Sequence, residues 1–87
     1  MANYFSHTVT TTATKVLDGD DLNRHVYLQI IGNETVYIGT DDQVTTSNGF
    51  PIVKHTDITD GILGASSELW AIVGTGTEDL RVFTSVD

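Results

Sequence analysis

The chain has 87 residues, of which 39% are hydrophobic and 18% charged, and it contains no cysteine. Four Lys and Arg against twelve Asp and Glu give a formal net charge of -8, which disfavours direct binding to nucleic acid or to anionic membranes. A chain of this size has room for one small domain with a modest core, and without disulfides a partner subunit is the expected source of extra stability. We therefore expect a single soluble globular domain, residues 1–87, that forms oligomers.

The first residues, 1–6, contain Tyr4 and Phe5 and lack the basic start and apolar stretch of a signal peptide. We expect the protein to stay in the compartment where it is made. Because an apolar strip is costly to expose, residues 1–6 form either an N-terminal arm onto a neighbour or a strand-leading segment packed on their own domain. Threonine-rich residues 9–17 predict a strand, since β-branched side chains favour strands over helices.

Residues 25–31 and 35–39 alternate between apolar and other side chains, which is the period of a strand. Only three residues separate the two runs, so the sequence predicts a hairpin. A three-residue loop pairs Ile30 with Val36 and keeps apolar residues on one face.

The middle of the chain predicts shorter elements. Asn48-Gly49 signals a turn, and Pro51 bars a central strand at that position. Residues 52–54 are expected to pair briefly, and residues 56–67 are expected to form a loop with one short extended piece around Ile62.

A second hairpin is predicted for residues 68–86, with Val73 opposite Leu80. This register places Trp70 opposite Phe83 on the other face, which is too apolar to leave in water. That face is expected to meet a second sheet or a neighbouring subunit. The two hairpins predict a core made of Val26, Leu28, Ile30, Val36, Ile38, Ala71, Val73, Leu80 and Val82.

These elements together predict an all-β fold, a small β-sandwich or barrel of about five to seven short antiparallel strands. Good helix formers are sparse, and no stretch sustains apolar spacing of three and four residues.

Few residues have the type and spacing of a metal-binding or catalytic site. Asp18, Asp20 and Asp21 match part of a calcium loop, but the ligands that should follow are missing, so a turn is preferred to a metal site. No two of the three histidines have the spacing of a local zinc site. Neither a nucleophile elbow nor a phosphate-binding loop is present. The sequence therefore predicts no enzymatic activity, no metal and no cofactor.

Six short motifs follow one another along the chain: TKVL (14–17), NR (23–24), TVYIG (35–39), VTTSNGFP (44–51), LWAI (69–72) and DLRV (79–82). Their order and spacing resemble small all-β structural proteins of tailed bacteriophages, over most of the chain from about Thr14 to Phe83. The resemblance implies a capsid decoration (cement) protein that binds and stabilises the outer surface of the assembled head, with head-fibre and tail-associated proteins in the same class. It implies the major capsid protein as partner, a homo-oligomer with a trimer favoured, and a place on the virion after synthesis in the host cytoplasm.

The residues expected at an oligomer or shell interface are those of the apolar segment and of the second apolar face: Tyr4, Phe5, Trp70, Ile72, Arg81 and Phe83. Arg81 is expected either in an intersubunit salt bridge or covering apolar surface with its stem. The alternative function is a carbohydrate-binding or adhesive module of a phage head or tail fibre, with Trp70, Tyr37 and Tyr27 as stacking platforms. Exposed, clustered aromatic residues beside carboxylates would favour that alternative, and burial of Trp70 would count against it.

Overall fold

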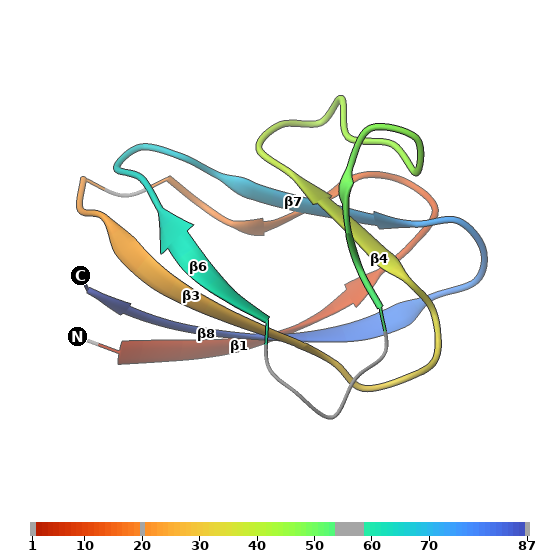
Figure 1. Ribbon diagram of the computed structural model, residues 1–87, viewed down its shortest axis with the longest axis horizontal. Helices are drawn as coiled ribbons and strands as arrows, with labels where there is room; N and C mark the ends of the chain where they lie inside the picture. The colour runs from red at the N-terminus through yellow and green to blue at the C-terminus, as the bar shows by residue number, and fades with distance from the viewer. Residues whose placement is uncertain (1, 20, 54–58, 87) are drawn as a thin grey trace.

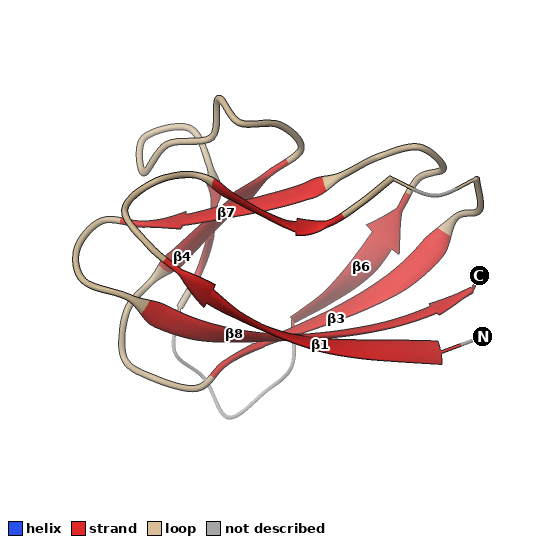
Figure 2. Cartoon of the chain, turned by 180° about the vertical axis from the view of Figure 1, so that it is seen from behind, coloured by secondary structure: helices blue, strands red, loops and turns tan. Residues whose placement is uncertain are grey.

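Two antiparallel sheets of four strands each face one another in the computed structural model, which describes residues 2–19, 21–53 and 59–86 (Figures 1 and 2). The described residues contain eight strands and no helix, so the all-β fold is confirmed and its strand count exceeds the predicted five to seven. Sheet A has the order β1-β8-β3-β6, with β1 (Ala2–Val9), β3 (Arg24–Ile30), β6 (Thr59–Leu63) and β8 (Glu78–Val86). Sheet B has the order β2-β7-β4-β5, with β2 (Thr14–Leu17), β4 (Val36–Gly39), β5 (Phe50–Ile52) and β7 (Leu69–Val73).

Both predicted hairpins are wrong, because the chain changes sheet at each of them. β3 lies in sheet A and β4 in sheet B, so Ile30 pairs with Leu80 and Val36 pairs with Val73. β7 and β8 are likewise in different sheets. Adjacent apolar runs can bury the same side chains either side by side in one sheet or facing each other across two sheets, and this chain adopts the second arrangement.

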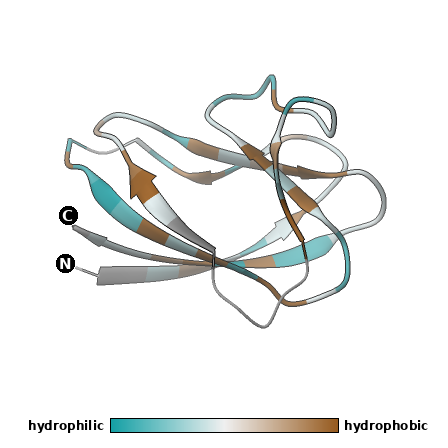
Figure 3. Ribbon diagram, in the orientation of Figure 1, coloured by the Kyte–Doolittle hydropathy of each residue, from teal (hydrophilic) through white to brown (hydrophobic). Residues whose placement is uncertain are grey.

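The core between the sheets consists of the residues that the alternation predicted. Eight of the nine predicted core residues are buried, and Ile38 is half-buried and packs against them. Hydrophobic and polar bands alternate along β3, as a strand with one buried face requires (Figure 3). The same core also includes residues of short strands and strand ends that the sequence pattern did not assign: Val9, Val16, Leu17, Ile52 and Leu69.

The N-terminal segment runs along β8 without a register shift, from Ala2 opposite Ser85 to Val9 opposite Glu78. Residues 2–6 therefore lie in β1 of their own domain. The predicted strand over residues 9–17 is interrupted by a turn, in which the Thr12 amide donates to Thr10 Oγ1 at 3.2 Å. A threonine hydroxyl of this kind competes with the strand ladder, and the chain crosses there to sheet B.

The middle segment forms two edge strands. Pro51 lies in β5 at the border of sheet B, as expected for a proline in a strand. Ile62 lies in β6, which extends the predicted short piece to five residues paired with β3. Residues 54–58, and with them the end of the predicted pairing over 52–54, lie outside the described residues.

A buried carboxylate holds the connection between β3 and β4. Glu78 is buried at the start of β8, and its Oε2 accepts from the amide of Gly32 at 2.6 Å. Its Oε1 accepts from the amide of Glu34 at 2.7 Å. A side chain at Gly32 would collide with this carboxylate, because an added Cβ would lie 2.5 Å from Oε2. Glu78 thus fixes the loop that carries the chain from sheet A to sheet B.

Leu80→Ala is expected to lower the free energy of unfolding by about 2–5 kcal/mol. Leu80 is fully buried between the sheets, so its truncation removes apolar contacts and leaves a cavity. Denaturant titration measures the loss, with the exposed loop residue Thr46 as control, where Thr46→Ala should stay within about 0.5 kcal/mol. A loss below about 1 kcal/mol for Leu80→Ala would contradict the assigned core.

Glu78→Gln is expected to cost about 1–3 kcal/mol of stability, because an amide group turned toward two backbone donors leaves at least one of them unsatisfied. Asp42→Asn removes the same charge from an exposed loop and should cost less than about 0.5 kcal/mol. Equal losses for the two variants in the same titration would show that net charge, and not the loop contact, sets the effect.

Candidate functional site

Three aromatic side chains form a row across the outer face of sheet A. Tyr4 in β1 pairs in register with Phe83 in β8, and Phe83 pairs with Tyr27 in β3. Each of the three alternates with inward-facing residues, so all three point away from the core. The Tyr27 and Phe83 rings meet edge to face, with centroids 5.8 Å apart. We call Tyr4, Tyr27 and Phe83 the aromatic face.

The aromatic face is open to solvent. Tyr4 is 84% exposed and Phe83 is 45% exposed, whereas Tyr27 is half-buried. The His25 ring stacks on Tyr27 with centroids 4.6 Å apart. The three rings also line a shallow hollow of about 250 Å³ that reaches Gln29. The sheet thus presents large apolar rings at its surface with polar groups beside them.

Arg81 borders the same hollow and is paired within its own strand. Its Nη2 donates to Asp79 Oδ2 at 3.0 Å, and its Nε lies 3.5 Å from Asp79 Oδ1. Asp79 raises the pKa of Arg81 above its ordinary value, chiefly through this hydrogen bond. The guanidinium therefore lies at the rim, half-exposed and paired with a carboxylate.

Trp70 and Ile72 lie on the outer face of the other sheet, because β7 belongs to sheet B. The predicted pairing of Trp70 with Phe83 is therefore wrong. Trp70 is half-buried, and its Nε1 donates to Glu68 Oε1 at 2.9 Å. Lys15 lies opposite Trp70 in the register and forms an ion pair with Glu68 at 3.6 Å. Sheet B thus surrounds its tryptophan with charged groups.

The six candidate interface residues therefore fall into separate places. Phe5 pairs with the buried Val82, so it lies on the inner side of β1 at the border of sheet A. It is 39% exposed and lies near His7, with ring centroids 6.1 Å apart. Four of the candidates lie in β1 and β8 of sheet A, and two lie in β7 of sheet B: Tyr4, Phe5, Arg81 and Phe83 against Trp70 and Ile72.

The predicted stacking platforms also separate. Tyr27 is on sheet A, whereas Tyr37 and Trp70 are on sheet B. Periodicity shows that Tyr27 faces outward, but only the strand order β1-β8-β3 brings it beside Tyr4 and Phe83, which are distant from it in the sequence. No local sequence pattern indicates this strand order.

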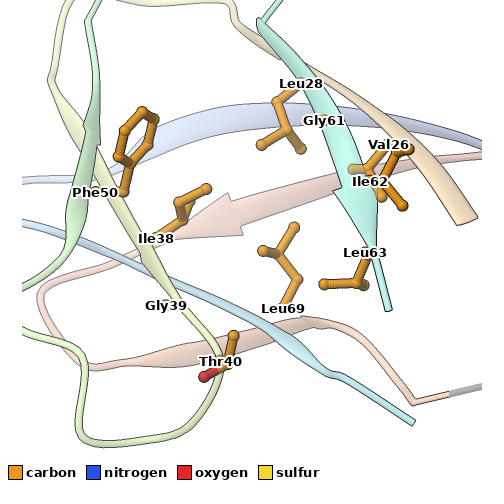
Figure 4. A pocket seen from close by; sticks show the side chains of 10 residues that line it. All are labelled: Val26, Leu28, Ile38, Gly39, Thr40, Phe50, Gly61, Ile62, Leu63 and Leu69. Atoms are coloured by element: carbon orange, nitrogen blue, oxygen red, sulfur yellow. The ribbon is translucent and has the colours of Figure 1, made fainter. Parts of the chain in front are cut away.

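A second hollow, of about 340 Å³, opens between the two sheets where β5 and β6 form their borders. Figure 4 shows Phe50 and Ile38 on one side and Leu28, Val26 and Leu63 on the other. Its lining is apolar except for Thr40. It lies beside the two short border strands, β5 with three residues and β6 with five. This cavity offers hydrocarbon contact but few groups that would orient a polar ligand.

In the acidic turn that matches part of a calcium loop, Asp18 pairs with a lysine. Asp18 Oδ1 forms an ion pair with Lys15 Nζ at 2.9 Å, which raises the pKa of Lys15. Asp20 and His55 lie outside the described residues. Among the residues that the structure describes, no group of three or more His, Cys, Asp or Glu could hold a metal ion. Within the same residues, no helix is long and apolar enough to cross a membrane.

Comparison with known proteins shows similarity at the level of the fold. No protein-family model matches the chain, and no curated protein matches it. A solved structure of Bacillus endospore appendages, described as a novel family of disulfide-linked pili, superposes with a TM-score of 0.60 at 14% sequence identity. The match covers 99% of this chain and 85% of that chain. The chain is thus a small all-β protein whose fold is similar to that of an appendage protein.

Removal of divalent metals is expected to leave the melting temperature unchanged within about 1 °C, because ligands that bind the folded state stabilise it only if a site exists. Thermal unfolding with and without EDTA measures this. A rise of several degrees with millimolar Ca²⁺ would contradict this expectation, and the acidic turn after Leu17 would be the first candidate for the site.

Proposed function

We propose that this chain is a non-enzymatic structural protein that docks on a larger protein assembly through the aromatic face. The observation that carries the proposal is the row of Tyr4, Phe83 and Tyr27, in which the first two rings are 84% and 45% exposed. Exposed apolar clusters rimmed by polar groups mark interaction sites, and aromatic residues with Arg are enriched in them. Arg81, held by Asp79, supplies such a polar rim.

The assembly that we favour is the shell of a tailed phage head, with the major capsid protein as partner. The succession of motifs that resembles small all-β phage proteins supports this choice. In this proposal the protein acts on the virion as a capsid decoration (cement) protein, after synthesis in the host cytoplasm. It binds neither nucleic acid nor membrane and needs no cofactor.

The similar fold of a pilus protein also supports a role in an assembly, but the subunits here cannot be linked by disulfides as in those pili. Those pili are described as disulfide-linked. The present sequence has no cysteine, so it cannot form such disulfide links through these 87 residues. Several weak contacts hold firmly only when they engage together, so we expect a homo-oligomer, for which the phage resemblance favours a trimer, bound to the completed lattice.

A carbohydrate-binding or adhesive role is the second candidate, because one observation favours it. Tyr27 and Phe83 line one hollow together with Arg81 and Gln29. The carboxylate of Asp79 forms an ion pair with Arg81 at the side of this hollow. Rings for stacking and planar polar groups for hydrogen bonding are what a sugar requires. Trp70, which is half-buried on the other sheet, does not contribute to this site.

Co-sedimentation with shells that lack the protein tests the docking proposal. Phe83→Ser is expected to weaken shell binding about tenfold or more, as truncation of an interface anchor does. Phe50→Ser is the matched control, since Phe50 is 63% exposed on sheet B and its truncation should leave binding unchanged.

Three outcomes would contradict the proposal. Wild-type protein that fails to bind shells would end the decoration role. Equal losses for Phe83→Ser and Phe50→Ser would show that the aromatic face is not the docking site. Binding to host polysaccharide, lost in Phe83→Ser, without binding to shells would establish the adhesive role instead.

A further inference from the structure

The strand at one border of sheet A lacks the features that normally protect a sheet edge. Exposed edges carry unpaired backbone groups, and proteins blunt them with charges, proline, bulges or short strands. β5 has three residues including Pro51, and β6 has five that include Asp60 and Gly61. β2 carries Lys15 and a register irregularity beside it. β1 has eight residues, with no proline, no charged residue and no register shift.

The backbone groups at this edge can be assigned from the ladder. The Ile31 amide donates to the carbonyl of Asp79 at 3.1 Å. The odd-numbered residues of β8 therefore direct their backbone N–H and C=O groups toward β3. Because the direction alternates along a strand, even-numbered residues of β8 face β1, where their partners are the odd residues Phe5 and His7. The N–H and C=O groups of Tyr4, Ser6 and Thr8 therefore point away from β8, toward the free edge.

Beyond Thr8, the next residue whose backbone points away from β8 already has a hydrogen-bond partner in sheet B. The next even residue is Thr10, and its carbonyl accepts from the amide of Val73 in sheet B at 3.0 Å. The open edge thus has a defined length, from Ala2 to Thr8.

The distribution of charge indicates which strand pairs there. Residues 1–14 contain no Asp, Glu, Lys or Arg, which is the longest uncharged run in a chain with a formal net charge of -8. Two copies of such an acidic chain repel each other over most of their surface. They can approach closely at an uncharged edge, and backbone pairing requires no further complementarity.

We propose that β1 pairs antiparallel with β1 of a second copy, about a twofold axis, so that two copies of sheet A form one continuous sheet. Antiparallel partners share a face, so the outward side chains of both strands stay outward. The register with the longest overlap places Tyr4 opposite Ser6 of the second copy. It also sets the two Phe5 rings side by side on the inner face, which covers a ring that is 39% exposed in the single chain.

Pairing about a twofold axis gives a closed dimer. It differs from the trimer that the phage resemblance favours, and the mass in solution decides between them. It does not depend on shell docking, because it requires neither a shell nor the ring of Phe83.

Sedimentation equilibrium over a range of concentrations measures the pairing. Wild-type protein should reach twice the 9.4 kDa mass of the chain. Ser6→Pro removes an amide that faces the free edge and that β8 does not use, so it should weaken the dimer about tenfold or more. It should not lower the melting temperature measured at concentrations where the wild type is monomeric. Ser6→Ala keeps that amide and should dimerise like the wild type.

Ser6→Lys is a second variant that keeps the backbone intact and places one charge on each side of the axis. It should also weaken the dimer, whereas Thr46→Lys, which adds the same charge to an exposed loop, should not. If Ser6→Pro fails to fold, this pair tests the edge by itself.

Amide hydrogen exchange gives a pattern that other interfaces would not produce. In the dimer the amides of Tyr4, Ser6 and Thr8 should exchange slowly, and on dilution they should become fast. Those of Phe5 and His7 should stay slow in both states, because β8 holds them. A monomer at concentrations up to about 1 mM, a trimeric mass, or an oligomer in which the Tyr4, Ser6 and Thr8 amides exchange fast would overturn the proposal.

Discussion

At six of the seven connections between successive strands that the structure describes, the chain crosses from one sheet to the other, so neither sheet is made from a continuous piece of sequence. Each strand is therefore held mainly by apolar contact across the space between the sheets and by neighbours that are distant in sequence. Leu80 in sheet A and Val36 in sheet B are both fully buried there. The loop contact of Glu78 depends on the same arrangement, since it joins the start of β8 to the connection that leaves β3.

Period-2 alternation could be read from the sequence because it is a local property. Residues such as Leu28 and Val82 face inward whichever strands they pair with, and the core was predicted on that basis. Pairing is different, since Ile30 and Val36 are buried both in a hairpin and in two facing sheets. A three-residue separation favours the hairpin locally, but the filling of one core by both sheets determines the result, and that depends on the whole chain.

The candidate site was harder to predict for the same reason. Tyr4, Tyr27 and Phe83 become neighbours only because β8 lies between β1 and β3. The sequence assigned Tyr4 and Phe83 to an interface from their apolar character, but it placed Phe83 beside Trp70 and grouped Tyr27 with Tyr37 and Trp70. These errors follow from the two hairpins, because an outward side chain gains the wrong neighbours when its strand is placed in the wrong sheet.

The outer face of sheet A carries the aromatic face, and the proposed edge pairing would place two such faces side by side. On sheet B, Lys15 forms ion pairs with Asp18 and Glu68, and Glu68 also accepts from Trp70, so charged groups lie beside the tryptophan there. A twofold axis perpendicular to sheet A would leave the aromatic faces of two copies on the same side of one continuous sheet. Two adjacent aromatic faces would then meet a flat partner together, and their individually weak contacts would add through a shared rigid sheet and not through a flexible linker.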